Sequence, residues 1–139
     1  MEERIPPHSD DAERSVLGSV MLRKEALFDV LELLAPEDFY SEVHREIFAA
    51  IRDLNKSSSP VDVLTVSEEL KKRKTLEMVG GRAYLAGLAS MVPSTANASA
   101  YAKIIRENAI LRKLIDVSSD IVDKSYRQKT DAAQVLDYA

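Results

Sequence analysis

Residues 97–127 read NASAYAKIIRENAILRKLIDVSSDIVDKSYR, and this stretch decides the fold. It contains no proline and no glycine, and it follows Pro93 with Ser94, Thr95 and Asn97 available as N-caps. Such a sequence predicts a single helix about 45 Å long at the usual rise per residue. A globule built from the preceding residues is narrower than that, so we expect the helix to project from it.

Apolar side chains divide the expected helix into two stripes. Both have the alternating three-and-four spacing of a helix seam, and the second lies about 100° further round the helix than the first. The first stripe consists of Tyr101, Ile104, Asn108, Leu111, Ile115, Ser118, Val122 and Ser125, and the second of Ile110, Leu114, Val117 and Ile121. Two stripes indicate two neighbours, an antiparallel helix of the same chain and another molecule, with a polar third side left for water. The alternative is a helix buried on two sides within its own domain.

The residues before this helix predict a compact bundle of short helices. We expect helices over residues 12–21, 24–34, 42–54 and 82–91, and one more that starts at either Asp62 or Thr65 and runs through Leu70. No segment has a convincing strand pattern. Gly18 lies inside the first helix, which predicts that another backbone passes close to it. The basic run at residues 71–74 is interpreted as a solvated helix C-terminus, where cations are favourable.

The residues after the long helix predict the start of a second arm. A turn is expected at residues 128–130, and Asp131 with Gln134 predicts a new helix. About two turns of helix are rarely stable alone, so we expect a helical hairpin whose second arm is truncated by the end of the chain. The predicted fold class is therefore all-α, with a helical globule at residues 1–93 and the hairpin at residues 94–139. The seam of Leu111, Ile115 and Val122 is expected to pack on the second arm, and to be exposed where that arm is missing.

Composition and charge limit the classes of function. The net charge of −4 and the isoelectric point near 5.2 argue against strong direct binding of nucleic acid, which needs a clustered excess of Lys and Arg. Cysteine is absent, and no run of apolar residues approaches the length of a membrane span. We therefore expect a cytoplasmic protein.

The sequence also lacks the patterns of an enzyme site. Neither Gly18 nor Gly80-Gly81 belongs to a phosphate-binding loop, and His8 and His44 have no metal-ligand spacing. We therefore expect no catalytic, cofactor-binding or metal-binding residues, and a binding or assembly module rather than an enzyme. A helix-turn-helix DNA-binding regulator built from residues 62–91 is the alternative, although its recognition helix would carry only Arg82 as a basic residue.

A series of short motifs in one order resembles a known family. The motifs are PPHS at 6–9, AERSVLG at 12–18, DFY at 38–40, HR at 44–45, IF at 47–48, PVD at 60–62 with Thr65, GG at 80–81, YL at 84–85, VP at 92–93, AN at 96–97 and YAKII at 101–105. Together they resemble the N-terminal domain of DnaB-type bacterial replicative DNA helicases, in register from about residue 4 to 127.

The resemblance implies a structure and a function beyond what the periodicity indicates. In that family the domain is a helical globule with a helical hairpin. Six copies, arranged as three dimers, form a collar that helps to hold the hexamer and docks the C-terminal helical domain of primase. ATP and Mg²⁺ are used by a C-terminal ATPase domain, which this sequence lacks; a helicase loader is a further candidate partner.

By the family's pattern, the primase-binding patch is expected at Tyr84, Arg112, Ile115 and Ile121. Core packing is the alternative role for Tyr84, and the hairpin's own seam is the alternative role for Ile115. The subunit or hairpin interface is expected to comprise Ile104, Ile110, Leu111, Leu114, Ile115, Val117, Ile121 and Val122.

Overall fold

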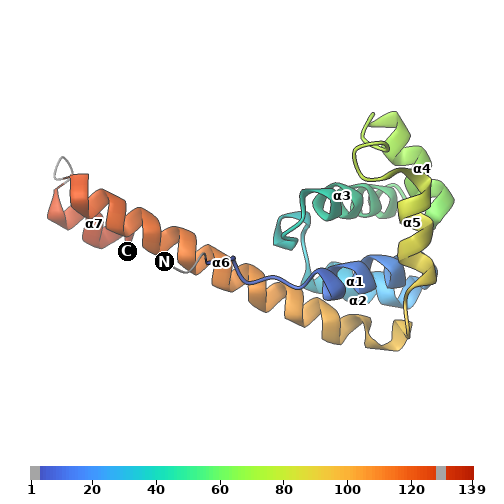
Figure 1. Ribbon diagram of the computed structural model, residues 1–139, viewed down its shortest axis with the longest axis horizontal. Coiled ribbons are helices and arrows are strands. Elements are labelled where there is room, and N and C mark those ends of the chain that lie inside the picture. The colour runs from blue at the N-terminus through green and yellow to red at the C-terminus, as the bar shows by residue number, and fades with distance from the viewer. Residues whose placement is uncertain (1–3, 128–130) are drawn as a thin grey trace.

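The computed structural model describes residues 4–127 and 131–139, and this part of the chain is helical without any β-strand. A bundle of short helices lies at one end, and a long helix projects from it (Figure 1). The elements are α1 (Asp10–Leu22), α2 (Lys24–Leu33), the 3₁₀ turn η1 (Pro36–Asp38), α3 (Glu42–Lys56), α4 (Val63–Lys72), α5 (Gly81–Ser90), the 3₁₀ turn η2 (Thr95–Asn97), α6 (Ala98–Arg127) and α7 (Ala132–Tyr138). The predicted fold class is confirmed.

The helices begin at polar residues that bind free backbone N–H groups. Ser9 accepts a hydrogen bond from Ala12 N at the start of α1, and Ser41 accepts one from His44 N at the start of α3. Asp62, not Thr65, caps α4: its carboxylate accepts from Thr65 N at 2.8 Å, while the Thr65 hydroxyl accepts from Asp62 N at 2.9 Å. Ser94 caps η2, so α6 begins one residue later than predicted.

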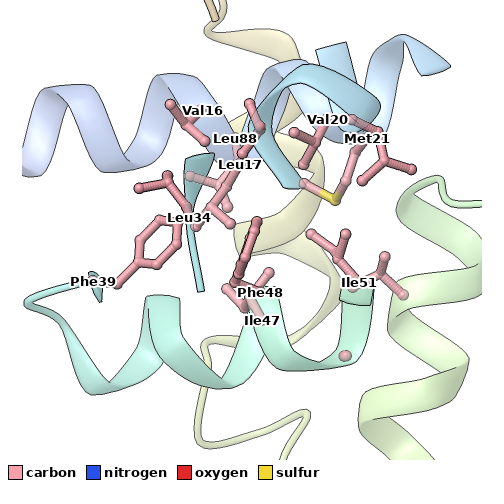
Figure 2. Close-up of a cluster of buried hydrophobic side chains, with 14 of the residues drawn as sticks. Val16, Leu17, Val20, Met21, Leu34, Phe39, Ile47, Phe48, Ile51 and Leu88 are labelled. Atoms are coloured by element: carbon pink, nitrogen blue, oxygen red, sulfur yellow. The ribbon is translucent and has the colours of Figure 1, made fainter. Parts of the chain in front are cut away.

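The core of the globule forms where α1 and α3 face each other. Leu17 and Val20 of α1 meet Phe48 and Ile51 of α3, and Phe39 closes one end (Figure 2). The rings of Phe39 and Phe48 lie 4.9 Å apart in a tilted arrangement that is favourable for aromatic pairs. This core fixes α1, α3 and α5 as one unit, from which α6 extends.

Gly18 confirms that a second backbone passes close to α1. A Cβ atom at this position would clash with the carbonyl oxygen of Leu88 in α5. We expect Gly18→Ala to lower the free energy of unfolding by about 3 kcal/mol, because the neighbour is backbone and cannot move aside easily. The matched control is Gly87→Ala, since Gly87 lies inside α5 with open space around its Cα. It should stabilise by about 0.5–1 kcal/mol; urea denaturation of both variants gives the comparison, and equal stabilities would contradict this account.

The basic run after α4 is only partly a solvated helix end. Lys71, Lys72 and Lys74 are exposed, as expected. Arg73 instead forms ion pairs with Glu69, with Asp53 of α3, and with Glu46 of α3 at 3.7 Å. The prediction of a solvated side chain is therefore wrong for Arg73, which joins the C-terminal end of α4 to α3.

Two further turns were expected from the sequence. The sequence predicts a brief helical turn over residues 76–79 that Gly80-Gly81 closes. The structure has a turn at residues 76–80, and Gly80 and Gly81 adopt positive φ values of 105° and 72° at its end. The turn expected at residues 128–130 lies outside the described residues.

Candidate interaction surface

The first turns of α6 attach the helix to the globule through the side that carries neither apolar stripe. Ala98, Ala102 and Ile105 are buried against the globule, where α6 packs on α1 and α2, and Ala109 is half-buried one turn further on. None of these four residues belongs to either predicted stripe. The prediction that this third side faces water is wrong for the first half of α6, because small side chains let the helix lie close to its neighbours. The expected boundary at residues 93 and 94 falls just before η2.

Both predicted stripes are exposed along much of α6. Six of the eight predicted interface residues have between 42% and 57% of their surface exposed, namely Ile104, Ile110, Leu111, Leu114, Ile115 and Val122. Val117 and Ile121 are half-buried. Aliphatic side chains that recur on a projecting helix and have no cover mark a surface for a partner.

The second stripe also borders a groove beside the globule. The groove has a volume of about 800 Å³ and lies between α6 and the segment from η1 to Tyr40. Ile110, Leu114 and Val117 line it from α6, and Glu37, Phe39 and Arg45 are among the residues on the opposite side. Both walls of the groove mix apolar and charged side chains, since Arg106, Lys113 and Asp116 also line it from α6.

The helix α7 doubles back along the far end of α6 (Figure 1). The Tyr138 hydroxyl donates to Asp120 Oδ2 at 3.1 Å, and this bond raises the pKa of Tyr138; Lys124 Nζ lies 3.3 Å from the centre of the Tyr138 ring. Asp120 and Lys124 share a side of α6 with Val117 and Ile121, by the spacing of three and four residues. The described part of the second arm therefore lies beside the second stripe, not on Leu111, Ile115 and Val122 as expected, and these three residues stay exposed.

Arg112 holds the globule to α6. Its guanidinium donates to the carbonyl oxygens of Pro7 and Asp38, both at 2.7 Å, and lies 5.5 Å from the centre of the Tyr40 ring. His8 stacks on the same Tyr40 ring, with the ring centroids 4.1 Å apart. Arg112 thus fixes the segment before α1 and the end of η1 against α6, and its contact with primase stays a prediction.

Tyr84 belongs to a network that the sequence analysis missed. It is half-buried on α5, and its hydroxyl oxygen lies 2.7 Å from Nε2 of His44 on α3. Nδ1 of His44 lies 2.7 Å from Oε1 of Glu13 on α1. Glu13 and His44 are only 1% and 4% exposed. The signal was present in the sequence, because both polar residues fall on the apolar faces of their predicted helices and can satisfy each other.

The carboxylate of Glu13 is stabilised in its charged form. Burial acts to raise its pKa, but the hydrogen bonds from His44 and from the backbone N–H groups of Tyr40 and Ser41 outweigh burial and lower the pKa below its ordinary value. The backbone bonds measure 2.8 Å and 3.3 Å. One buried charge thus joins α1, the turn before α3, α3 itself and α5.

Over the described ranges, no group of three or more His, Cys, Asp or Glu side chains is arranged to hold a metal ion. The helices that the structure describes also include none with both the length and the apolar character needed to cross a membrane.

The fold defines a class, an all-α domain in which a long helix projects from a bundle of short helices. The chain belongs to the family of DnaB-like helicase N-terminal domains, whose family model matches residues 5–107. The replicative DNA helicase DnaB of Geobacillus stearothermophilus is 42% identical to it over 137 residues, which are 99% of this chain and 30% of that relative. The chain thus spans less than a third of the length of that relative.

Solved structures agree with this assignment. The N-terminal domain of DnaB helicase from Mycobacterium tuberculosis, known from a crystal structure, matches with a TM-score of 0.91 and 43% identity, covering 96% of this chain and 94% of that one. A DnaB-like replicative helicase, described together with its interactions with primase, matches with a TM-score of 0.74 and 28% identity over 84% of this chain and 27% of that one. The resemblance drawn from the short motifs is confirmed.

The alternative of a helix-turn-helix regulator is wrong. Residues 73–80 separate α4 from α5, which is longer than the tight turn of that motif. Leu85 and Leu88 of α5 are buried, and the family to which the chain belongs is a helicase domain.

Proposed function

We propose that this chain is the collar domain of a hexameric replicative DNA helicase in the cytoplasm, where it supports ring assembly and docks primase. The observation that carries the proposal is the first apolar stripe, whose residues Leu111, Ile115 and Val122 are exposed on α6. The DnaB-like helicase that shares this fold at 28% identity is described with its interactions with primase, which supports the same partner here. The docking partner is taken to be the C-terminal helical domain of primase, as the family resemblance implies, and a helix face with aliphatic side chains suits a helical partner.

The two stripes suit two partners. The position of α7, whose Tyr138 contacts Asp120 and Lys124 of α6, supports packing of the second stripe within the hairpin. The first stripe, with Leu111, Ile115 and Val122, lies free of α7 and suits primase or a second copy of the chain. ATP and Mg²⁺ belong, in this proposal, to a helicase domain outside the residues described.

Titration calorimetry with the C-terminal helical domain of the matching primase tests the docking role. We expect Ile115→Asp to weaken binding at least tenfold, because it puts a charge into an apolar contact that must lose its water. Ala96→Asp is the matched control, since it adds the same charge at an exposed position of η2, before α6 begins, and should bind like the unchanged chain. Equal affinities of all three proteins would remove the first stripe from the docking surface.

Arg112→Ala is a poor test of direct contact. Its loss also removes both hydrogen bonds that hold Pro7 and Asp38 against α6. Light scattering on the Ile115→Asp variant separates the two roles of the stripe: a change in self-association without a change in primase binding would assign the stripe to a second copy of the chain.

A further inference from the structure

Side chains from three helices hold residues 38–41, the linking segment that joins η1 to α3. The Glu13 carboxylate of α1 accepts two backbone N–H groups of the segment at 2.8 and 3.3 Å, and Arg45 of α3 donates to two of its carbonyl oxygens, both at 2.9 Å. Arg112 of α6 donates to a third carbonyl oxygen, that of Asp38, at 2.7 Å. Most of the segment lies outside any helix, so these side chains satisfy its backbone and determine its position.

The helix α6 has two anchors on the globule. Its first turns pack on α1 and α2, beginning with the buried Ala98. Further along, Arg106 and Arg112 both bind Asp38, the first its carboxylate at 3.2 Å and the second its carbonyl oxygen. Ala98 and Arg112 are about 21 Å apart along the helix, and a second anchor at that distance fixes the direction in which the helix leaves the globule. Among the described residues, Arg112 is the last one of α6 with a hydrogen bond to the globule.

The shape of the Arg112 side chain matters for the second anchor. Its two terminal nitrogens donate to the carbonyl oxygens of Pro7 and Asp38, both at 2.7 Å, and its guanidinium carbon lies 5.5 Å from the centre of the Tyr40 ring. A planar guanidinium can bridge two acceptors in this way, whereas the ammonium group of a lysine is a point charge on a flexible stem. Arg112→Lys therefore keeps the charge but removes the bridge.

We propose that the linking segment sets the direction in which α6 projects, and that Glu13 is a positioning residue for α6. None of the hydrogen bonds of the Glu13 side chain reaches α6, since they join it to Tyr40, Ser41 and His44. Glu13 therefore acts through the backbone of the segment, which Arg112 also binds. Because α6 carries the apolar stripes, a change that moves the segment alters where the stripes lie relative to the globule. The proposal concerns one chain alone and holds whether or not a partner binds.

The distance between two spin labels measures the direction of α6. The chain has no cysteine, so Lys56→Cys at the exposed end of α3 and Tyr126→Cys near the end of α6 give two unique sites. Tyr126 lies about 21 Å beyond Arg112, so a swing of about 10° moves its label by about 4 Å. Pulsed electron paramagnetic resonance of the labelled chain, diluted with unlabelled chain, gives distances within one molecule. We expect Arg112→Lys to shift or widen the distance distribution, and Lys113→Ala, at an exposed neighbouring position, to leave it unchanged.

Glu13→Gln in the same labelled chain tests the role of Glu13. Glutamine keeps the shape of the side chain but offers one acceptor oxygen in place of two, so the segment loses a backbone partner. We expect the distribution to shift or widen, as in Arg112→Lys. Asp11→Asn, at an exposed position of the same helix, is the matched control and should leave it unchanged. A folded Glu13→Gln protein with an unchanged distribution would overturn the proposal.

Hydrogen exchange tests the same link without altering Glu13. The N–H group of Tyr40 is bonded to Glu13, and in Arg112→Lys we expect its exchange to accelerate by at least about threefold, because a segment with one anchor fewer opens more often. The N–H group of Leu70, which is buried in α4, is the control and should keep its rate. An unchanged rate at Tyr40 would show that the two ends of the link are independent, and an equal acceleration at Leu70 would show only a loss of overall stability. Either result would overturn the proposal.

Discussion

Replacing Glu13 with alanine is expected to lower the free energy of unfolding by about 3–5 kcal/mol, the range for breaking a buried, hydrogen-bonded charge pair. The loss leaves the N–H groups of Tyr40 and Ser41 and Nδ1 of His44 without their acceptor. Each of these groups would be buried or half-buried without compensation. Urea denaturation of the variant and the unchanged chain measures the difference.

Asp11→Ala is the matched control for this prediction. Asp11 lies two residues before Glu13 in the same helix, and its side chain is 94% exposed and paired only with Arg14. An exposed ion pair contributes little, so this variant should change stability by less than about 1 kcal/mol. If both variants unfold at the same urea concentration, the Glu13 network does not hold the globule together.

The lowered pKa of the Glu13 carboxylate predicts how the free energy of unfolding depends on pH. Because folding lowers the pKa of Glu13 below its ordinary value of 4.5, the folded state binds this proton more weakly than the unfolded state. Its contribution is therefore fully present above pH 4.5 and is lost as the pH falls through the lowered pKa. Glutamine does not titrate, so the Glu13→Gln variant should not lose stability by this route in acid. The difference in free energy of unfolding between the variant and the unchanged chain should therefore shrink below pH 4.5.

The stripes on α6 could be predicted because long aliphatic side chains give a strong periodic signal. Ile110, Leu114 and Ile115 lie on an exposed helix, as expected. The side that attaches α6 to the globule could not be predicted in the same way. It is formed largely by Ala98, Ala102 and Ala109, whose small side chains add little apolar area to any pattern. Arg112 lies at the edge of the side that attaches α6 to the globule. Its sequence position suggests a solvent-exposed charge, whereas its long side chain reaches two backbone carbonyl groups.

The pairing of Glu13 with His44 could not be predicted from the sequence for a different reason. Each residue in isolation has an ordinary role at a helix start or on a helix face, and only the packing of α1 against α3 brings them together. A charged residue on an apolar face is the signal that a partner must exist, since an unpaired buried charge is too costly. Glu13 and His44 lie 31 positions apart on the apolar faces of their helices, and the position of the third member, Tyr84, depends on where α5 crosses α3.

Phe48→Ala is the second substitution with a large expected effect. The Phe48 side chain is completely buried between α1 and α3 and packs against the ring of Phe39 (Figure 2). Truncation removes its apolar contacts and leaves a cavity, which typically costs about 3–5 kcal/mol. That loss is a large share of the 5–15 kcal/mol by which domains are usually stable.

Phe28→Ala is the control for Phe48→Ala, because it also removes an aromatic ring but takes little packing away from the core. Phe28 lies on α2 with 47% of its surface exposed, and its ring lies 5.6 Å from Lys24 Nζ. Its truncation should cost less than about 1 kcal/mol, whereas Phe48→Leu should recover most of the stability lost in Phe48→Ala because it refills the site. Thermal unfolding of the three variants gives the order of their stabilities.

Because Phe48 is four residues after His44 on α3, the Phe48→Ala variant should also shift the NMR signals of His44, while Phe28→Ala should leave them in place. An unchanged His44 spectrum in a destabilised Phe48→Ala would show that the Glu13, His44 and Tyr84 network keeps its geometry independently of the core beneath it.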